Sequence, residues 1–309
     1  MMNPKKTWIQ RQEKKTNEQL AAAHACELLE SNGMLSNPVD PFQLAAVERR
    51  RLRLIGADLK NRCDGQLEYH RDKDLFVLFY NNRYDLGRPD AAHHARTRFS
   101  VAHELAHFYL EHHRAHLMCG GQSRPSTGEF SSNELFEREA DSFAASLLMP
   151  SPLLRPIVNQ GELCLDRIEA IASRFQTSLL STAIRSVQHS DFPCEVVGIR
   201  GGQIAWRFRP NGSRDPLKEG GCYTLPIGPI RSKNAASQWQ FFLTGASVRS
   251  CLAGKPTDWF TLYGPAQREF TVWEHYLPIS IMNTLLVLLT VSESELFDLD
   301  STDCDPNED

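Results

Sequence analysis

Three residues in the stretch HELAH, His103, Glu104 and His107, have the types and the spacing needed to hold zinc and use it. Residues i and i+4 of an α-helix stack on one face, so the two imidazoles can reach one point in space. The carboxylate beside the first histidine can then take a proton from a water molecule at the metal. The pattern predicts a hydrolytic zinc site with His103 and His107 as ligands and Glu104 as the general base.

A catalytic zinc site also needs a third protein ligand, with one position left open for water and substrate. The acidic segment FEREADSFAASLLMP, which reads as a helix ended by its proline, offers candidates. Glu137 and Asp141 share a helical face, whereas Glu139 points about 200° away at roughly 100° per residue. Glu134 lies at the helix start, where the helix dipole also favours an acid. A carboxylate of the Glu137 face can complete the site, and the acid one turn later can orient a ligand imidazole.

The competing interpretation of HELAH is an amphipathic helix whose histidines lie near its polar edge, because short motifs also arise by chance. The acidic helix that follows, and the order of strand, loop and helix around HELAH, favour the metal site. His112, His113 and His116 continue the same helix and its exit. We expect them to be ordinary surface histidines of a helix end, although one of them could stabilise an oxyanion.

The two motifs, RFSVAHELAHFYLEHH and EREADSFAASLLMP, together resemble the ImmA/IrrE family of bacterial metallopeptidases, HExxH zinc enzymes of the gluzincin type. The resemblance extends over residues 16–187 and includes the stretches NPVDPFQLAAVERRRLRL and LFVLFYNN. It implies one Zn²⁺ per chain, bound by His103, His107 and Glu137, with Glu104 as the general base.

This sequence departs from the usual family pattern at two positions near the motifs. Ala106 stands where glycine is frequent, which a helix tolerates easily. Asp141 stands where asparagine is frequent, so it adds charge near the ligands. We therefore expect, from its position and charge, that Asp141 orients a ligand imidazole.

The resemblance implies a cytoplasmic zinc-dependent endopeptidase that cleaves a helix–turn–helix transcriptional repressor and so derepresses stress-response or mobile-element genes. One alternative is a regulatory binding protein of the same fold, whose metal site is structural or vestigial. A second alternative is a DNA-binding regulator that uses the basic cluster at Arg49 and a helix pair within residues 163–187. The second helix of that pair contains only Arg185 as a basic residue, so we favour a packing role and expect no direct binding of nucleic acid.

The secondary structure that is predicted around the site changes in kind along the chain, from mainly helices to mainly strands. Helices are predicted over residues 16–34 and after the NPVDP break, followed by a hairpin in GQLEYHRDKDLFVLFYNN with a charged turn at residues 71–74. Strand-like stretches dominate later: EVVGIR, QIAWRFRP, QWQFFLTG, WFTLYG and REFTVWEHY. The apolar run at 277–291 is too short to span a bilayer and is predicted to be a buried helix.

The predicted fold class is α+β. It has a mainly helical zincin-like metallopeptidase domain with a small sheet, followed by a second α+β domain with a mostly antiparallel sheet. The predicted domains are a basic extension (1–15), the metallopeptidase domain (16–190), a domain of unknown, sensor-like role (191–291) and an acidic tail (292–309).

Composition limits the classes of protein to which the sequence can belong. The 309 residues are 41% hydrophobic and 23% charged, which is typical of a soluble globular protein. The net charge is −4 and the tail alone contributes −8, so the remaining residues sum to +4. We expect that tail to be disordered, with an autoinhibitory or partner-mimicking role as the alternative. Eight cysteines without a CxxC pair and a basic amino terminus without an apolar segment favour a reducing cytoplasm and no membrane partner.

Overall fold

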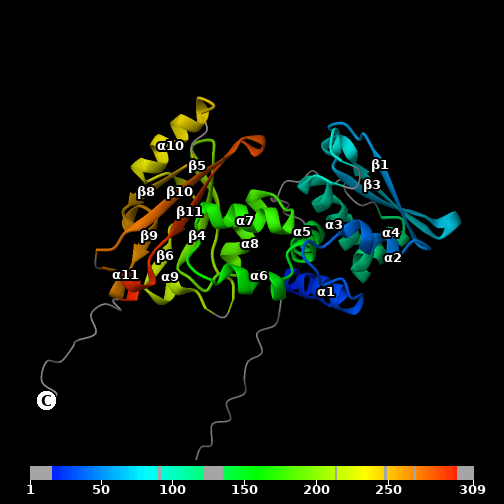
Figure 1. Cartoon of the computed structure of the whole chain (residues 1–309), viewed down its shortest axis with the longest axis horizontal. Coiled ribbons are helices and arrows are strands. Elements are labelled where there is room, and N and C mark those ends of the chain that lie inside the picture. Colours follow the sequence, from blue (N-terminus) through cyan, green and yellow to red (C-terminus); the bar gives the residue numbers. More distant parts are fainter. Residues whose placement is uncertain are drawn as a thin grey trace, which may run out of the picture. The chain divides into compact units, whose positions relative to one another are not determined.

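The computed structural model describes residues 16–89, 92–121, 135–212, 214–246, 249–267 and 269–297. Contacts between Cα atoms divide the chain into two compact units. Unit 1 contains most residues up to Leu147, and unit 2 contains the rest, together with two short earlier segments at Ser36–Asp40 and His93–Arg96. Both units combine helices with a sheet (Figure 1), so the predicted α+β class is confirmed.

Unit 1 is built from five helices and three strands of the described residues. They are α1 (Asn17–Ser31), α2 (Pro41–Val47), β1 (Leu52–Ala57), β2 (Gly65–His70), β3 (Leu75–Asn81), α3 (Ala95–Tyr109), α4 (Glu111–Met118) and α5 (Leu135–Leu148). The sheet order is β1-β3-β2, with β1 parallel and β2 antiparallel to β3. The predicted hairpin is therefore confirmed, and its charged turn is a short 3₁₀ helix at Arg71–Lys73.

The helix that carries HELAH is buried on nearly all sides. Every α3 residue from Val101 to Phe108 is buried. The ring of Phe108 meets Phe76 of β3 edge-on at 5.3 Å between centroids, which packs α3 against the small sheet. A helix so enclosed can hold its side chains in fixed positions, which a metal site requires.

Helix α5 is fixed to the start of α1. Thr16 caps α1 by a reciprocal pair of hydrogen bonds with Gln19. The Ser142 hydroxyl donates to the Glu18 carbonyl at 2.8 Å, and Arg138 Nε lies 3.3 Å from the Glu18 carboxylate. These contacts join the helix that carries the acidic motif to the start of α1.

Unit 2 contains a long antiparallel sheet covered on both faces. Its helices are α6 (Ser151–Val158), α7 (Leu165–Phe175), α8 (Leu179–Gln188), α9 (Pro216–Glu219), α10 (Lys233–Leu243) and α11 (Glu293–Phe297). Its strands are β4 (Cys194–Arg200), β5 (Gln203–Phe208), β6 (Cys222–Thr224), β7 (Gly228–Pro229), β8 (Ser250–Gly254), β9 (Phe260–Leu262), β10 (Val272–Ile279) and β11 (Thr284–Thr290). The main sheet has the order β7-β5-β4-β11-β10-β8 with antiparallel neighbours, and β6 pairs with β9.

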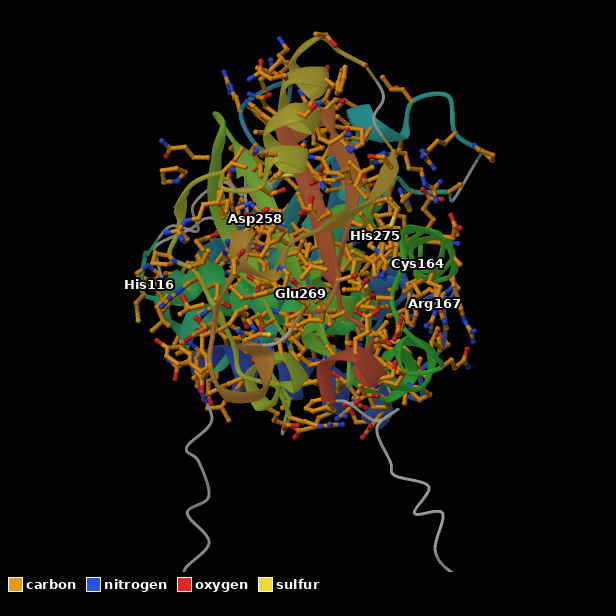
Figure 2. All side chains as sticks on the ribbon, turned by 90° about the vertical axis from the view of Figure 1, so that its left-hand side faces the viewer. His116, Cys164, Arg167, Asp258, Glu269 and His275 are labelled. Atoms are coloured by element: carbon orange, nitrogen blue, oxygen red, sulfur yellow. The ribbon has the colours of Figure 1, made fainter. Side chains whose placement is uncertain are left out.

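Two hydrophobic clusters lie on opposite faces of this sheet. One cluster joins α6, α7 and α8 to Val196 and Leu288, and the other joins α10 to Val197 and Leu289. All seven residues of β11 are consequently buried. His275 of β10 lies on this sheet (Figure 2), with its Nε2 3.2 Å from the Thr290 hydroxyl of β11.

Two predicted elements of unit 2 are wrong. Residues 277–291 form the end of β10, a turn and β11 rather than a helix, because a strand buried on both faces shows a continuous apolar run. Asn283 makes the turn in the left-handed region at φ 45°. QWQFFLTG is mostly the end of α10 rather than a strand: Ser232 caps this helix, and Ala235, Trp239 and Phe242 face the core at helical spacing.

The compact units divide between Leu147 and Leu148, whereas the sequence pattern places a boundary near Ser190. The difference arises because α7 and α8 share a core with β4 and β11. Similarly, α11 falls within the segment predicted to be disordered, and its Leu296 is fully buried. The basic extension at 1–15 and residues 298–309 lie outside the described residues. Over the described ranges, the structure has no helix long and apolar enough to cross a membrane.

Candidate metal centre

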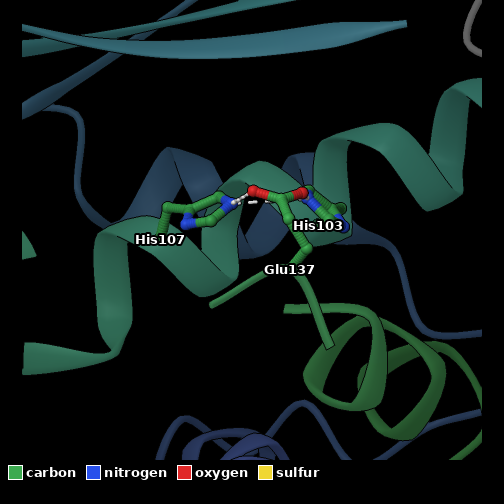
Figure 3. Close-up of side chains that lie close together, drawn as sticks. All are labelled: His103, His107 and Glu137. Atoms are coloured by element: carbon green, nitrogen blue, oxygen red, sulfur yellow. Dashed lines mark hydrogen bonds and ion pairs between the residues drawn. The ribbon is translucent and has the colours of Figure 1, made fainter. Parts of the chain in front are cut away.

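His103, His107 and Glu137 converge in unit 1 (Figure 3). The Nε2 atoms of the two histidines lie 3.3 Å apart. One carboxylate oxygen of Glu137 lies 3.2 Å from His103 Nε2, and the other lies 3.8 Å from His107 Nε2. The structure thus brings together the three residues expected to bind zinc, from α3 and α5.

Asp141 and Glu104 are the other two residues of the predicted site. Asp141 Oδ1 lies 2.9 Å from His103 Nδ1, on the far side of the ring from Glu137. Glu104 follows His103 on α3 and is fully buried. Both histidines are 3% exposed, whereas Glu137 and Asp141 are partly exposed. The carboxylates of α5 therefore lie between the buried histidines and solvent.

The charges at His103 strongly favour a cation. Burial by itself lowers the pKa of His103, but hydrogen bonds with Asp141 and Glu137 outweigh burial and raise that pKa to about 10. Without a metal ion, His103 therefore carries a proton and a positive charge beside these two acids at neutral pH. A metal ion that binds here must displace this proton.

His107 is held by a second set of contacts that the sequence did not predict. Its Nδ1 lies 2.9 Å from Nδ1 of His113, and His113 Nε2 lies 2.7 Å from a carboxylate oxygen of Glu139. Burial, followed by electrostatic interaction with His103 and His113, keeps the pKa of His107 well below its ordinary value. Burial also lowers the pKa of His113, against the attraction of Glu139. His107 is thus a neutral imidazole at neutral pH.

A break in the helix places His113 beside His107. α3 ends at Tyr109, Leu110 adopts an extended backbone with ψ 115°, and α4 begins at Glu111. The expectation that His113 is a surface residue of a continuing helix is therefore wrong, since its side chain is 1% exposed and stacks on Phe136 at 4.2 Å. The expectation does hold for the other two: the side chain of His112 is 54% exposed, and His116 is exposed as well (Figure 2). His112 and His113 are adjacent in the sequence, and no feature of the sequence pattern predicts which of the two is buried.

His112, His113 and Glu139 form a second group of potential ligands. Both histidine Nε2 atoms already lie within hydrogen-bond distance of the same Glu139 oxygen, at 2.5 and 2.7 Å. These contacts identify a carboxylate that accepts two N–H bonds. Burial raises the pKa of Glu139, but its hydrogen bonds with the two histidines lower it below the ordinary value. Glu139 points away from Glu137, as its helical position predicts, and Glu134 lies outside the described residues.

The donor set of the first group fits zinc. Two imidazole nitrogens and one carboxylate are the ligands of one common class of catalytic zinc site, which leaves a fourth position open. Ligand nitrogens of a tetrahedral zinc ion lie about 3.3 Å apart when the bonds are about 2.0–2.1 Å long. The 3.3 Å between the Nε2 atoms of His103 and His107 agrees with that separation.

Residues 68–186 match the family model of IrrE N-terminal-like domains, a peptidase family. This part of the chain belongs to the IrrE N-terminal-like peptidase family. The resemblance that the two motifs carry is confirmed, and both motifs lie within the matched residues. This family assignment supports a peptidase of the metal-dependent type.

A likeness in fold extends beyond the IrrE-type segment. The chain resembles a solved structure titled Mycobacterium tuberculosis transcriptional regulator, with a TM-score of 0.52 and 13% identity, over 93% of this chain and 81% of that one. At this identity the likeness concerns the fold alone. No curated protein matches the chain.

Proposed function

We propose that this protein is a zinc-dependent endopeptidase whose site is formed by His103, His107, Glu137 and Glu104. The observation that carries the proposal is the convergence of two imidazoles and a carboxylate at one buried point of an IrrE-type domain. His103, His107 and Glu137 would hold the ion, and Asp141 would orient His103 through its Nδ1. When bound, zinc supplies Lewis-acid polarisation of the scissile carbonyl and lowers the pKa of a water molecule.

Glu104 acts as the proton carrier in this proposal. Glu104 is fully buried and directly follows the first histidine on α3. A carboxylate in such a position accepts a proton from the attacking water and returns it to the amine that leaves. Glu137 and Asp141 of α5 flank His103 and have other roles in this proposal, as ligand and as orienting acid.

The substrate class comes from the family resemblance: a separate helix–turn–helix repressor, whose cleavage would derepress stress-response or mobile-element genes. A cytoplasmic location is supported by the cysteines, since all seven in the described part of the chain are free.

A DNA-binding role for the helix pair has less support. α8, the second helix, is buried from Leu180 to Val187. Its only basic residue, Arg185, is itself buried and donates to the Ser151 hydroxyl at 3.3 Å. A recognition helix needs several exposed side chains for phosphate and base contacts. The peptidase proposal is therefore preferred over a regulator that reads DNA through α8.

The proposal is tested by incubating the purified, zinc-loaded protein with candidate helix–turn–helix repressors. Cleavage should appear with zinc, disappear with a chelator, and return when zinc is restored. Binding of a repressor without cleavage under all three conditions would instead support the regulatory binding protein of the same fold.

A further inference from the structure

Helix α5 supplies an acid to the unused side of each histidine ligand. Asp141 reaches Nδ1 of His103 directly. Glu139 reaches Nδ1 of His107 through the ring of His113, with distances of 2.7 and 2.9 Å along the chain. One helix thus provides both the carboxylate that faces the metal position and the supports behind the two imidazoles.

The direction of the hydrogen bonds in the second chain can be deduced if His107 binds metal through Nε2. A ligand nitrogen must present its lone pair, so the proton of a neutral His107 lies on Nδ1. His107 Nδ1 must then donate to His113 Nδ1, which leaves the proton of His113 on Nε2. A carboxylate of Glu139 is an acceptor only, and it accepts that last N–H.

We propose that His113 and Glu139 are positioning residues of the metal site, which fix the proton of His107 on Nδ1 and keep its Nε2 lone pair directed at His103 and Glu137. The inference rests on the proposed metal-binding role of His107. Neither His113 nor Glu139 touches the ion or the substrate.

The surroundings hold the hydrogen-bonded series of Glu139, His113 and His107 rigidly. His113 and Glu139 are each 1% exposed, so water does not compete for their hydrogen bonds. The His113 ring stacks on Phe136 of α5 at 4.2 Å between centroids, with 17° between planes. A supporting hydrogen bond held in this way lowers the cost of orienting the ligand when metal binds.

His112 provides a matched control within the same cluster. Its Nε2 lies 2.5 Å from the same Glu139 oxygen, but its ring is half-exposed and is connected to Glu139 rather than to His107. The substitution His112→Phe therefore removes one hydrogen bond from Glu139 and leaves the chain to His107 intact. His113→Phe keeps a ring to stack on Phe136 but removes both nitrogens from the chain.

The test measures the zinc dissociation constant of the full chain by competition with a chromophoric chelator. Supporting residues of this kind change metal affinity by about 10–100-fold. We expect such a loss for His113→Phe and for Glu139→Gln, and less than about a threefold change for His112→Phe. Glu139→Gln keeps the inference testable if His113→Phe does not fold.

A second readout separates positioning from a general structural role. Nitrogen-15 NMR of the metal-free wild type at neutral pH should show the His107 proton on Nδ1, and His113→Phe should lose that preference. Equal losses of affinity in the His112 and His113 variants would overturn the inference, as would a His107 proton on Nε2. Two zinc ions per chain, with one lost in His112→Phe, would also overturn it, since His113 Nε2 would then be a ligand.

These measurements are independent of proteolysis. If zinc binding depends on His113 as expected while no repressor is cleaved, the inference stands and the peptidase proposal fails. If His107→Ala binds zinc as tightly as wild type, the proposed ligand set is wrong and the inference fails with it.

Discussion

The carboxylate of Asp141 and the imidazole of His103 form a direct 2.9 Å contact between Oδ1 and Nδ1. The opposite nitrogen of the same ring faces Glu137 at 3.2 Å. His103 is thus held between two acids of α5, one on each side of its ring. Such a contact fixes both the ring orientation and the nitrogen that is left for a metal ion.

Asp141→Ala should weaken zinc binding by about 10–100-fold without changing the fold, because His103 loses the acceptor for its Nδ1 proton. Asp141→Asn keeps an acceptor oxygen without the charge and should lose less. Competition with a chromophoric chelator measures both variants. An alanine variant with wild-type affinity would show that Asp141 does not support the site.

Zinc affinity should rise about tenfold per pH unit between pH 7 and pH 8.5, because zinc must displace a proton from His103. The sign follows from a pKa raised to about 10: the proton is still bound throughout this window and competes with the metal. A histidine with its ordinary pKa of about 6.5 would already be deprotonated, and the affinity would be nearly flat. Chelator competition across this range, corrected for the chelator's own protonation, distinguishes the two results.

Glu137→Ala should abolish stoichiometric zinc after dialysis against a mild chelator, because one of the three proposed ligands is removed. Glu139→Gln should retain one zinc ion per chain in the same dialysis and show only the weaker affinity of a supporting residue. Metal analysis gives both values. Zinc retained by the Glu137 variant and lost by the Glu139 variant would reverse the assignment of the third ligand.

Leu296→Ala should destabilise the protein by about 2–5 kcal/mol, the usual cost of emptying a fully buried leucine site. Leu296 is 0% exposed and packs on Gly220, where an added Cβ would lie 2.5 Å from its Cγ. Leu243→Ala is the control, since Leu243 is 57% exposed and the change should cost less than about 0.5 kcal/mol. Urea unfolding checks both. Equal, small effects would show that α11 is not part of the unit 2 core.

Helical periodicity lets the sequence predict which of the candidate site residues share a helical face. His103 and His107, and Glu137 and Asp141, are pairs at i and i+4, and each pair does share a helical face. The burial of His113 could not be predicted in the same way. It depends on the break at Leu110, where no proline or glycine marks the end of α3.

Two differences between expectation and structure in unit 2, at residues 277–291 and at α11, have one physical origin. A continuous apolar run has no period, so residues 277–291 do not distinguish a buried helix from a strand that is covered on both faces. The charge of residues 292–309 is typical of a disordered tail, yet Leu296 of α11 lies in the unit 2 core and Phe297 packs against it. In both cases packing against residues distant in the sequence determines the secondary structure, and the local sequence pattern does not reveal that packing.

Proton transfer by Glu104 in a zinc peptidase is tested most directly by comparing cleavage of a repressor substrate by wild type and by Glu104→Gln, each shown by metal analysis to contain one zinc ion. An amide cannot accept the proton, so the variant should keep its zinc and its fold while the cleavage rate falls by at least about 100-fold. A fully zinc-loaded Glu104→Gln protein that cleaves at near the wild-type rate would contradict the claim.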